Sequence, residues 1–203
     1  SLAASVIATR KAREEARKLL SNLKVSPEGF QSLIEDADPV LRRVILKSIK
    51  KAPSEEALDL WRQELLTGNN PAKTEMALYM LARFGKREDA MFALAYLGAD
   101  LQEVARNALD LLHSQNVDLF RENVTAALGS AMVEIQLFAV QKLRPLNAAL
   151  ACSHLERLVS SADIFVRQKA IHELLLIPFS EAEALYLRCI SLDPDGGCRV
   201  VAT

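Results

Sequence analysis

The segment Asp163-Ile-Phe-Val166-Arg167-Gln-Lys-Ala170-Ile-His-Glu-Leu174 carries the pattern that predicts the fold of this chain. Counted from Val166, its apolar residues lie at positions i, i+4, i+5 and i+8, so they form one face of an α-helix. Equivalent faces begin at Leu41, Lys73, Val104, Ile135 and Val166, with gaps of 32, 31, 31 and 31 residues. A period of this size predicts units that bury their apolar faces only by stacking on one another.

Each unit is predicted to contain two helices joined by a short turn. The apolar stripe ends at a residue that stops or turns a helix, namely Pro53, Gly85, Asn116, Asn147 or Pro178. A second helix follows each turn, and the predicted ranges are 27–34, 54–66, 87–97, 117–128, 147–159 and 180–191. Ser180 and Glu183 have the spacing of a capping box at the start of one such helix. The segment 88–97 is apolar on nearly every side, so we expect it to be buried all round.

Composition supports an all-α fold of about five to six two-helix units. Half of the residues are hydrophobic but only 5% are aromatic, which favours close-packed helices over sheets. The net charge of −1 does not favour nucleic acid or an anionic membrane as a partner. The charge is uneven, because residues 1–52 hold 11 Lys/Arg and 6 Asp/Glu while residues 53–203 hold 14 and 20. Either this is a functional polarity or it is ordinary scatter of surface charge.

The two ends of the chain suggest a single domain, residues 1–203, cut from a longer protein. Residues 26–203 hold the repeats, and residues 1–25 are expected to form either an N-terminal capping helix or a juxtamembrane helix. The apolar stretch 1–8 runs into Arg10, Lys11 and Arg13, and positive charge just beyond a membrane helix marks the cytoplasmic side. We therefore expect a cytoplasmic protein, or the cytoplasmic domain of a protein with a membrane segment before Ser1.

The cysteines also agree with a cytoplasmic location. Their number is odd, and Cys152, Cys189 and Cys198 have neither zinc-ligand spacing nor an evident pairing, which fits a reducing environment.

The segment 163–174 resembles the HEAT-repeat signature, whose spacing is D-x-x-V-R-x-x-A-x-x-x-L. More narrowly, the chain is similar over residues 26–203 to the short HEAT-like repeats of the phycobilisome lyase type. Asp38-Pro-Val-Leu41-Arg42 and Asp195-Gly-Gly-Cys198-Arg199 match the opening of the signature. Other units depart from it, because Thr74, Ala105 and Gln136 stand where the arginine belongs and Lys73 occupies an apolar position.

The resemblance implies a right-handed α-solenoid, but it does not specify a function. HEAT arrays serve as scaffolds, receptors, lyases and DNA-binding enzymes alike. In such families the signature aspartate and arginine bond between adjacent units. The pairs Asp163 with Arg167, Asp38 with Arg42 and Asp195 with Arg199 are therefore expected to be structural.

Catalytic motifs do not stand out in the sequence. Metal-ligand spacing is absent from the three histidines, His113, His154 and His172. The His172-Glu173 pair resembles the iron-binding His-Glu pairs of HEAT-type deoxyhypusine hydroxylases, but that family needs several such pairs and this chain has one. A glycine-rich phosphate loop and a Gly-x-Ser-x-Gly elbow are both absent. We expect no enzymatic activity, no metal, no cofactor and no small-molecule substrate. Trp61 alone is a poor stacking surface for the bases of nucleic acid.

Two basic features remain as candidate binding sites. Arg157 and Arg188 share one position of the second helix, with Arg62 one residue short of it. In HEAT solenoids the second helices line the concave face, where such arginines could bind carboxylates or phosphates of a partner. Alternatively they are solvated side chains lying over apolar neighbours. The second feature is the basic end of the chain, which includes Arg42, Arg43 and Lys47 among its repeat residues.

The sequence therefore favours a non-catalytic scaffold that binds another protein or a peptide on its concave face. The alternative is nucleic-acid binding through the basic N-terminal repeats, and a third possibility is an accessory subunit of lyase or chaperone type.

Overall fold

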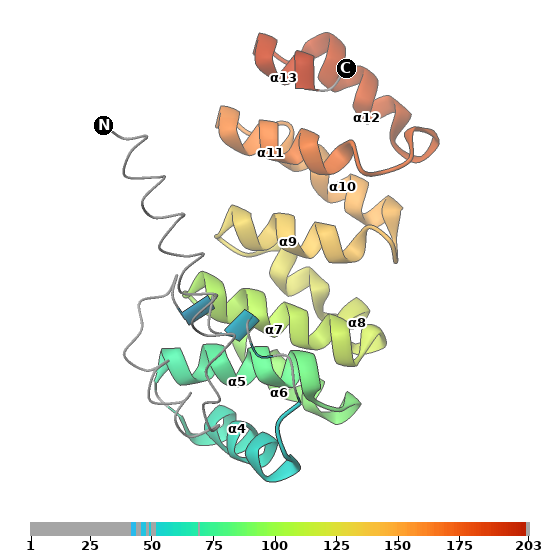
Figure 1. Cartoon of the computed structure of the whole chain (residues 1–203). Helices are drawn as coiled ribbons and strands as arrows, with labels where there is room; N and C mark the ends of the chain where they lie inside the picture. Colours follow the sequence, from blue (N-terminus) through green and yellow to red (C-terminus); the bar gives the residue numbers. More distant parts are fainter. Residues whose placement is uncertain (1–41, 44–45, 48, 50–51, 69, 202–203) are drawn as a thin grey trace, which may run out of the picture.

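The computed structural model describes residues 42–43, 46–47, 49, 52–68 and 70–201, and all regular structure in this part of the chain is helical (Figure 1). The expected all-α fold is thereby confirmed. The first helices of the units are α5 (Pro71–Phe84), α7 (Gln102–Gln115), α9 (Val133–Leu143), α11 (Ile164–Leu174) and α13 (Gly196–Val201). The continuous second helices are α4 (Glu55–Thr67), α8 (Val117–Leu128), α10 (Ala148–Leu158) and α12 (Phe179–Leu192). The ranges predicted for these second helices agree to within one residue at either end. The expected helices at 1–25 and 27–34 lie outside the described residues.

The remaining second helix is not continuous. It consists of a 3₁₀ turn η1 (Arg87–Asp89), a single α turn α6 (Ala90–Ala93) and a further 3₁₀ turn η2 (Leu94–Tyr96). Ala90 and Ala93 are buried, but 59% of Met91 is exposed, so the expectation of burial on all sides is wrong. The segment packs mainly on α7, and its contacts with the neighbouring second helices are few.

Asparagines at the turns explain why one helix ends and the next begins there. Asn116 ends α7, and its side chain accepts a hydrogen bond from Leu119 N at 3.2 Å at the start of α8. Asn147 caps α10 in the same way. In the last complete unit Pro178 takes this position and provides no side-chain cap, and α12 is kinked at Ala182. The capping box expected at Ser180 is therefore not formed, because a residue inside its first turn is not helical.

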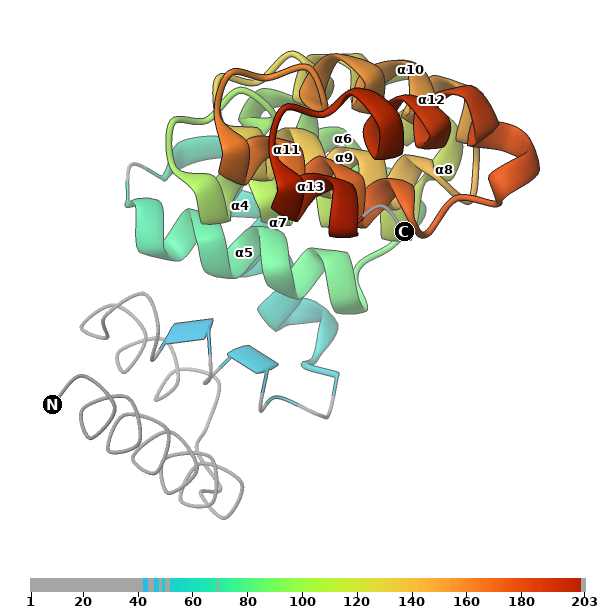
Figure 2. The same cartoon turned by 90° about the horizontal axis from the view of Figure 1, so that it is seen from above.

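The helices stack in chain order from α4 to α13, with the first helices in one layer and α8, α10 and α12 in the other (Figures 1 and 2). Successive first helices contact one another at every step from α5 to α13, whereas α8 has only sparse contacts with the second helices on either side. An alanine, with no exposed surface, recurs in the first helices at Ala77, Ala108, Ala139 and Ala170. Such a small side chain lets helix backbones approach closely.

Hydrogen bonds join residues about one period apart in the sequence. Tyr96 Oη donates to Leu65 O at 2.7 Å, across a separation of 31 residues. Asn107 Nδ2 donates to Glu75 O at 3.1 Å, across 32 residues. Each of these units is thus fixed to its neighbour by polar contacts as well as by the apolar core.

The buried alanines predict a position-specific limit on side-chain size. Ala108→Leu should lower the free energy of unfolding by about 1–3 kcal/mol, because a larger side chain forces the first helices apart. Ala126→Leu is the matched control, since Ala126 is an exposed alanine on α8. Urea denaturation of both variants measures the effect. Equal stability of the two variants would contradict close packing at Ala108.

Candidate functional site

Arg62 is bound within the chain on several sides. Its Nε and Nη2 donate to the two carboxylate oxygens of Asp89 at 2.7 and 2.9 Å, and its Nη1 donates to Glu55 and Asp59. These hydrogen bonds, led by the one to Asp89, raise the pKa of Arg62 despite its burial. Burial by itself raises the pKa of Asp89, but Arg62 and the backbone amide of Lys86 bring it below its ordinary value. Arg62 therefore ties α4 to the following second helix.

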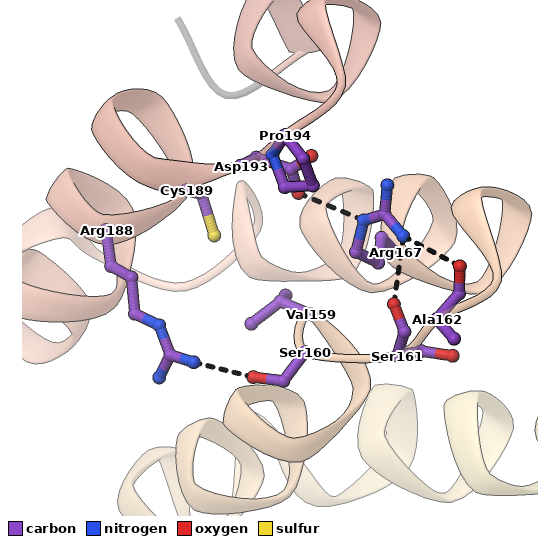
Figure 3. A pocket seen from close by; sticks show the side chains of 9 residues that line it. All are labelled: Val159, Ser160, Ser161, Ala162, Arg167, Arg188, Cys189, Asp193 and Pro194. Atoms are coloured by element: carbon purple, nitrogen blue, oxygen red, sulfur yellow. Dashed lines mark hydrogen bonds and ion pairs between the residues drawn. The ribbon is translucent and has the colours of Figure 1, made fainter.

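Arg157 and Arg188 play the same part at their shared repeat position. Arg157 Nη2 donates to Leu128 O at 3.2 Å, at the end of the preceding second helix. Arg188 donates to Ser160 Oγ at 2.7 Å (Figure 3). It also donates to Glu156 at 3.2 Å, again at the end of the preceding second helix. The structure thus gives each of the three predicted arginines a partner in the chain. Their role as anchors for another protein stays a prediction.

The basic residues Arg42, Arg43 and Lys47 do not form one open cluster. Arg42 Nε donates to Glu75 at 2.8 Å in a largely buried ion pair, and Arg43 contacts Glu103. Burial raises the pKa of Glu75, although Arg42 opposes that shift. Lys47 is exposed. The rest of the basic N-terminal end lies outside the described residues.

The signature arginine of α11 is structural, as expected, but its acidic partner is not Asp163. Arg167 is 8% exposed and donates to the carbonyl oxygens of Ser161 and Ala162, while its Nε donates to Asp193 at 3.2 Å (Figure 3). Asp163 instead caps its own helix by accepting from Phe165 N at 2.8 Å. The Arg167 side chain lies beside a cavity of about 400 Å³ between the last units.

Gln136 replaces that arginine in α9, and a buried histidine completes its hydrogen bonding. Gln136 Nε2 donates to Ser130 O at 2.6 Å, so its Oε1 accepts from His154 Nε2 at 3.1 Å. His154 Nδ1 then accepts from Arg157 at 3.4 Å, which fixes the neutral tautomer with its proton on Nε2. Burial, aided by the charge of Arg157, lowers the pKa of His154 to about 4.

A groove of about 490 Å³ crosses three successive first helices, α7, α9 and α11. Its floor is formed by Leu137 and Phe138 of α9, and Gln102 and Arg106 of α7 line it on one side. The α11 side is formed by Gln168, Lys169, His172 and Glu173. Sequence reasoning missed this site because it concentrated on the second helices. The available signal was a set of amide side chains on the outward faces of the first helices.

Charges within the groove are mostly paired. Lys169 binds Glu134 at 2.8 Å, and this hydrogen bond lowers the pKa of Glu134. Glu173 accepts hydrogen bonds from Gln141 and Arg144. Arg106 differs, because its side chain makes no ion pair with a described residue. Instead, its guanidinium carbon lies 4.3 Å from the centre of the Phe138 ring. The groove therefore combines an apolar floor, amide groups and one uncompensated positive charge.

Other kinds of site find no support in the described part of the chain. There, no group of three or more His, Cys, Asp and Glu side chains could hold a metal ion. Trp61 is buried in α4 and offers no stacking surface to a base. Within the described helices, none combines the length and apolar character that crossing a membrane requires.

The pKa of His154 predicts acid sensitivity. Because the folded pKa of about 4 lies below the ordinary 6.5, the unfolded chain takes up this proton first as the pH falls. The associated stability is fully present above pH 6.5 and is lost between pH 6.5 and about 4. Between pH 7 and pH 4, the free energy of unfolding of the wild-type chain should fall by about 3 kcal/mol more than that of His154→Gln. Urea denaturation at both pH values measures this, with His172→Gln, an exposed histidine, as control.

Because Arg167 is buried, replacing it should lower the free energy of unfolding more than replacing an exposed arginine does. Arg167→Met removes the donor to Asp193 and to two carbonyl oxygens, and it should cost about 3 kcal/mol of unfolding free energy. Arg188→Met removes an exposed ion pair and should cost less than about 1 kcal/mol. Thermal and urea unfolding compare them, and equal losses would contradict the structural role assigned to Arg167.

Comparisons with known proteins leave the family of this chain open. No model of a known protein family matches the sequence. A comparison with curated protein sequences likewise finds no significant match.

Proposed function

We propose that this chain is a non-catalytic scaffold for protein–protein interaction, built as a right-handed α-solenoid of short HEAT-like repeats. The 31-residue period supports the solenoid, as do the hydrogen bonds that join residues about one period apart. The stacking of the helices in chain order supports it as well. The partner is another protein or a peptide bound on the concave face.

The first helices, rather than the second, are proposed to form that concave face. Consecutive first helices contact one another throughout, while contacts between consecutive second helices are sparser. A two-layer stack bends toward the layer whose helices are closer together. This assignment differs from the expectation, taken from the HEAT resemblance, that the second helices line the concave side.

The groove on α7, α9 and α11 is the observation that carries the proposal. It joins equivalent faces of three consecutive units, so one partner segment could contact all of them. The second helices present fewer side chains to a partner, because Arg62, Arg157 and Arg188 already bind groups of this chain. We place the scaffold in a reducing compartment such as the cytoplasm, because its cysteines are free thiols.

Photo-crosslinking tests whether the chain binds another protein and whether it does so through the first-helix face. A benzoylphenylalanine at His172, in the groove, should crosslink a protein in cells of the source organism. The same residue at Glu122, exposed on α8, is the control and should crosslink little. Crosslinks to protein from Glu122 alone would overturn the choice of face.

The same crosslinking in a lysate of these cells separates the scaffold from nucleic-acid binding. Crosslinks to nucleic acid that weaken steeply with added salt would favour binding through the basic N-terminal repeats. The absence of any crosslinked protein at His172 would contradict the scaffold.

A further inference from the structure

Arg106 lines one side of the first-helix groove, with its guanidinium over the apolar floor, in a position suited to binding an anion. Its guanidinium lies over the Phe138 ring, whose face attracts cations. The ring restrains the side chain without consuming its N–H donors. A guanidinium presents these donors in a planar fork that matches a carboxylate.

The other charges around Arg106 cancel. Lys142, whose Nζ lies 5.1 Å from the centre of the same ring, binds Asp110 at 2.6 Å. Lys169 is neutralised by Glu134, and Arg144 by Glu173. One positive charge thus remains in the groove, and a single negative charge would complement it.

Two amide side chains also line the groove. Gln102 of α7 and Gln168 of α11 line the groove, and neither makes a side-chain hydrogen bond within the described residues. An amide donates and accepts, which matches the backbone of an extended peptide. Helices in contact lie about 8–10 Å apart, so three of them span about 20 Å. At about 3.3 Å per residue, an extended segment of about six residues crosses that distance.

We propose that the groove binds an extended acidic peptide segment of a partner protein. An Asp or Glu of the segment pairs with Arg106, and a neighbouring apolar side chain packs on Leu137 and Phe138. Gln102 and Gln168 bond its backbone. This inference rests on the proposed scaffold function and adds the chemistry of the partner.

Peptide chemistry fits the groove better than nucleic acid does. Binding to a phosphate backbone draws on many unpaired cations, each of which neutralises one phosphate. Here Lys142, Lys169 and Arg144 are already paired with Asp110, Glu134 and Glu173, so Arg106 alone among the described cations around the groove is left to neutralise a phosphate. One carboxylate beside an apolar group is the complementary ligand.

Selection from a random library of linear dodecapeptides displayed on phage tests the proposal with the whole chain as bait. Peptides that bind the wild-type protein are expected to carry Asp or Glu beside Leu, Ile or Phe. Arg106→Glu should weaken the binding of a selected synthetic peptide at least tenfold. Arg83→Glu is the matched control, because Arg83 also lies over a phenylalanine ring, 5.1 Å from the centre of Phe84, but outside the groove.

A charge swap separates direct pairing from a general effect on folding. The selected peptide with its acid changed to Lys should bind Arg106→Glu more tightly than it binds the wild-type protein. Urea denaturation checks that both variants are folded.

Three outcomes would overturn the proposal: no peptide selected, selected peptides without an acid, or an equal loss with Arg83→Glu. If His172 crosslinks a partner protein but binding by peptides does not depend on Arg106, the acidic-peptide chemistry fails while the scaffold stands. If no protein is crosslinked at His172, the scaffold itself fails.

Discussion

The close approach of the first helices is the constraint on which the rest of the structure depends. In α5, α7, α9 and α11 it needs a small side chain at one repeat position, and Ala77, Ala108, Ala139 and Ala170 have no exposed surface. The next residue in each of these helices is a larger apolar side chain, also fully buried, namely Leu78, Leu109, Val140 and Ile171. Small and large residues side by side give a layer that is dense without being overpacked. The groove lies on that layer and takes its floor from it.

Helix positions could be predicted from the sequence because they depend on local chemistry. The apolar spacing within a helix and the turn residues Asn116 and Asn147 act over a few residues, and the structure confirms both. Two local predictions were wrong. The capping box at Ser180 does not form beside the kink at Ala182, and Met91 is exposed although its segment is apolar. The kink interrupts the first turn that the capping box needs, and the segment around Met91 makes few contacts with the neighbouring second helices.

Side-chain partners could not be predicted in the same way. Arg62 pairs with Asp89 27 residues away, and Arg167 pairs with Asp193 26 residues away. Such choices depend on how one unit sits on the next, which a single sequence does not state. The groove was missed for the same reason, because Gln102, Phe138 and Gln168 come from three different units. Their common surface exists only once the units are stacked.

The polar ties between units have a mechanical consequence. Among the described residues most of them reach only the next unit, although Arg43 and Glu103 span two. A stack held by nearest-neighbour contacts behaves like a spring whose junctions flex one by one. Tension along such a stack alters the distance between α7 and α11, and with it the separation of Gln102 and Gln168. In the proposed scaffold, the affinity of this groove for its partner would therefore depend on the load that the protein bears.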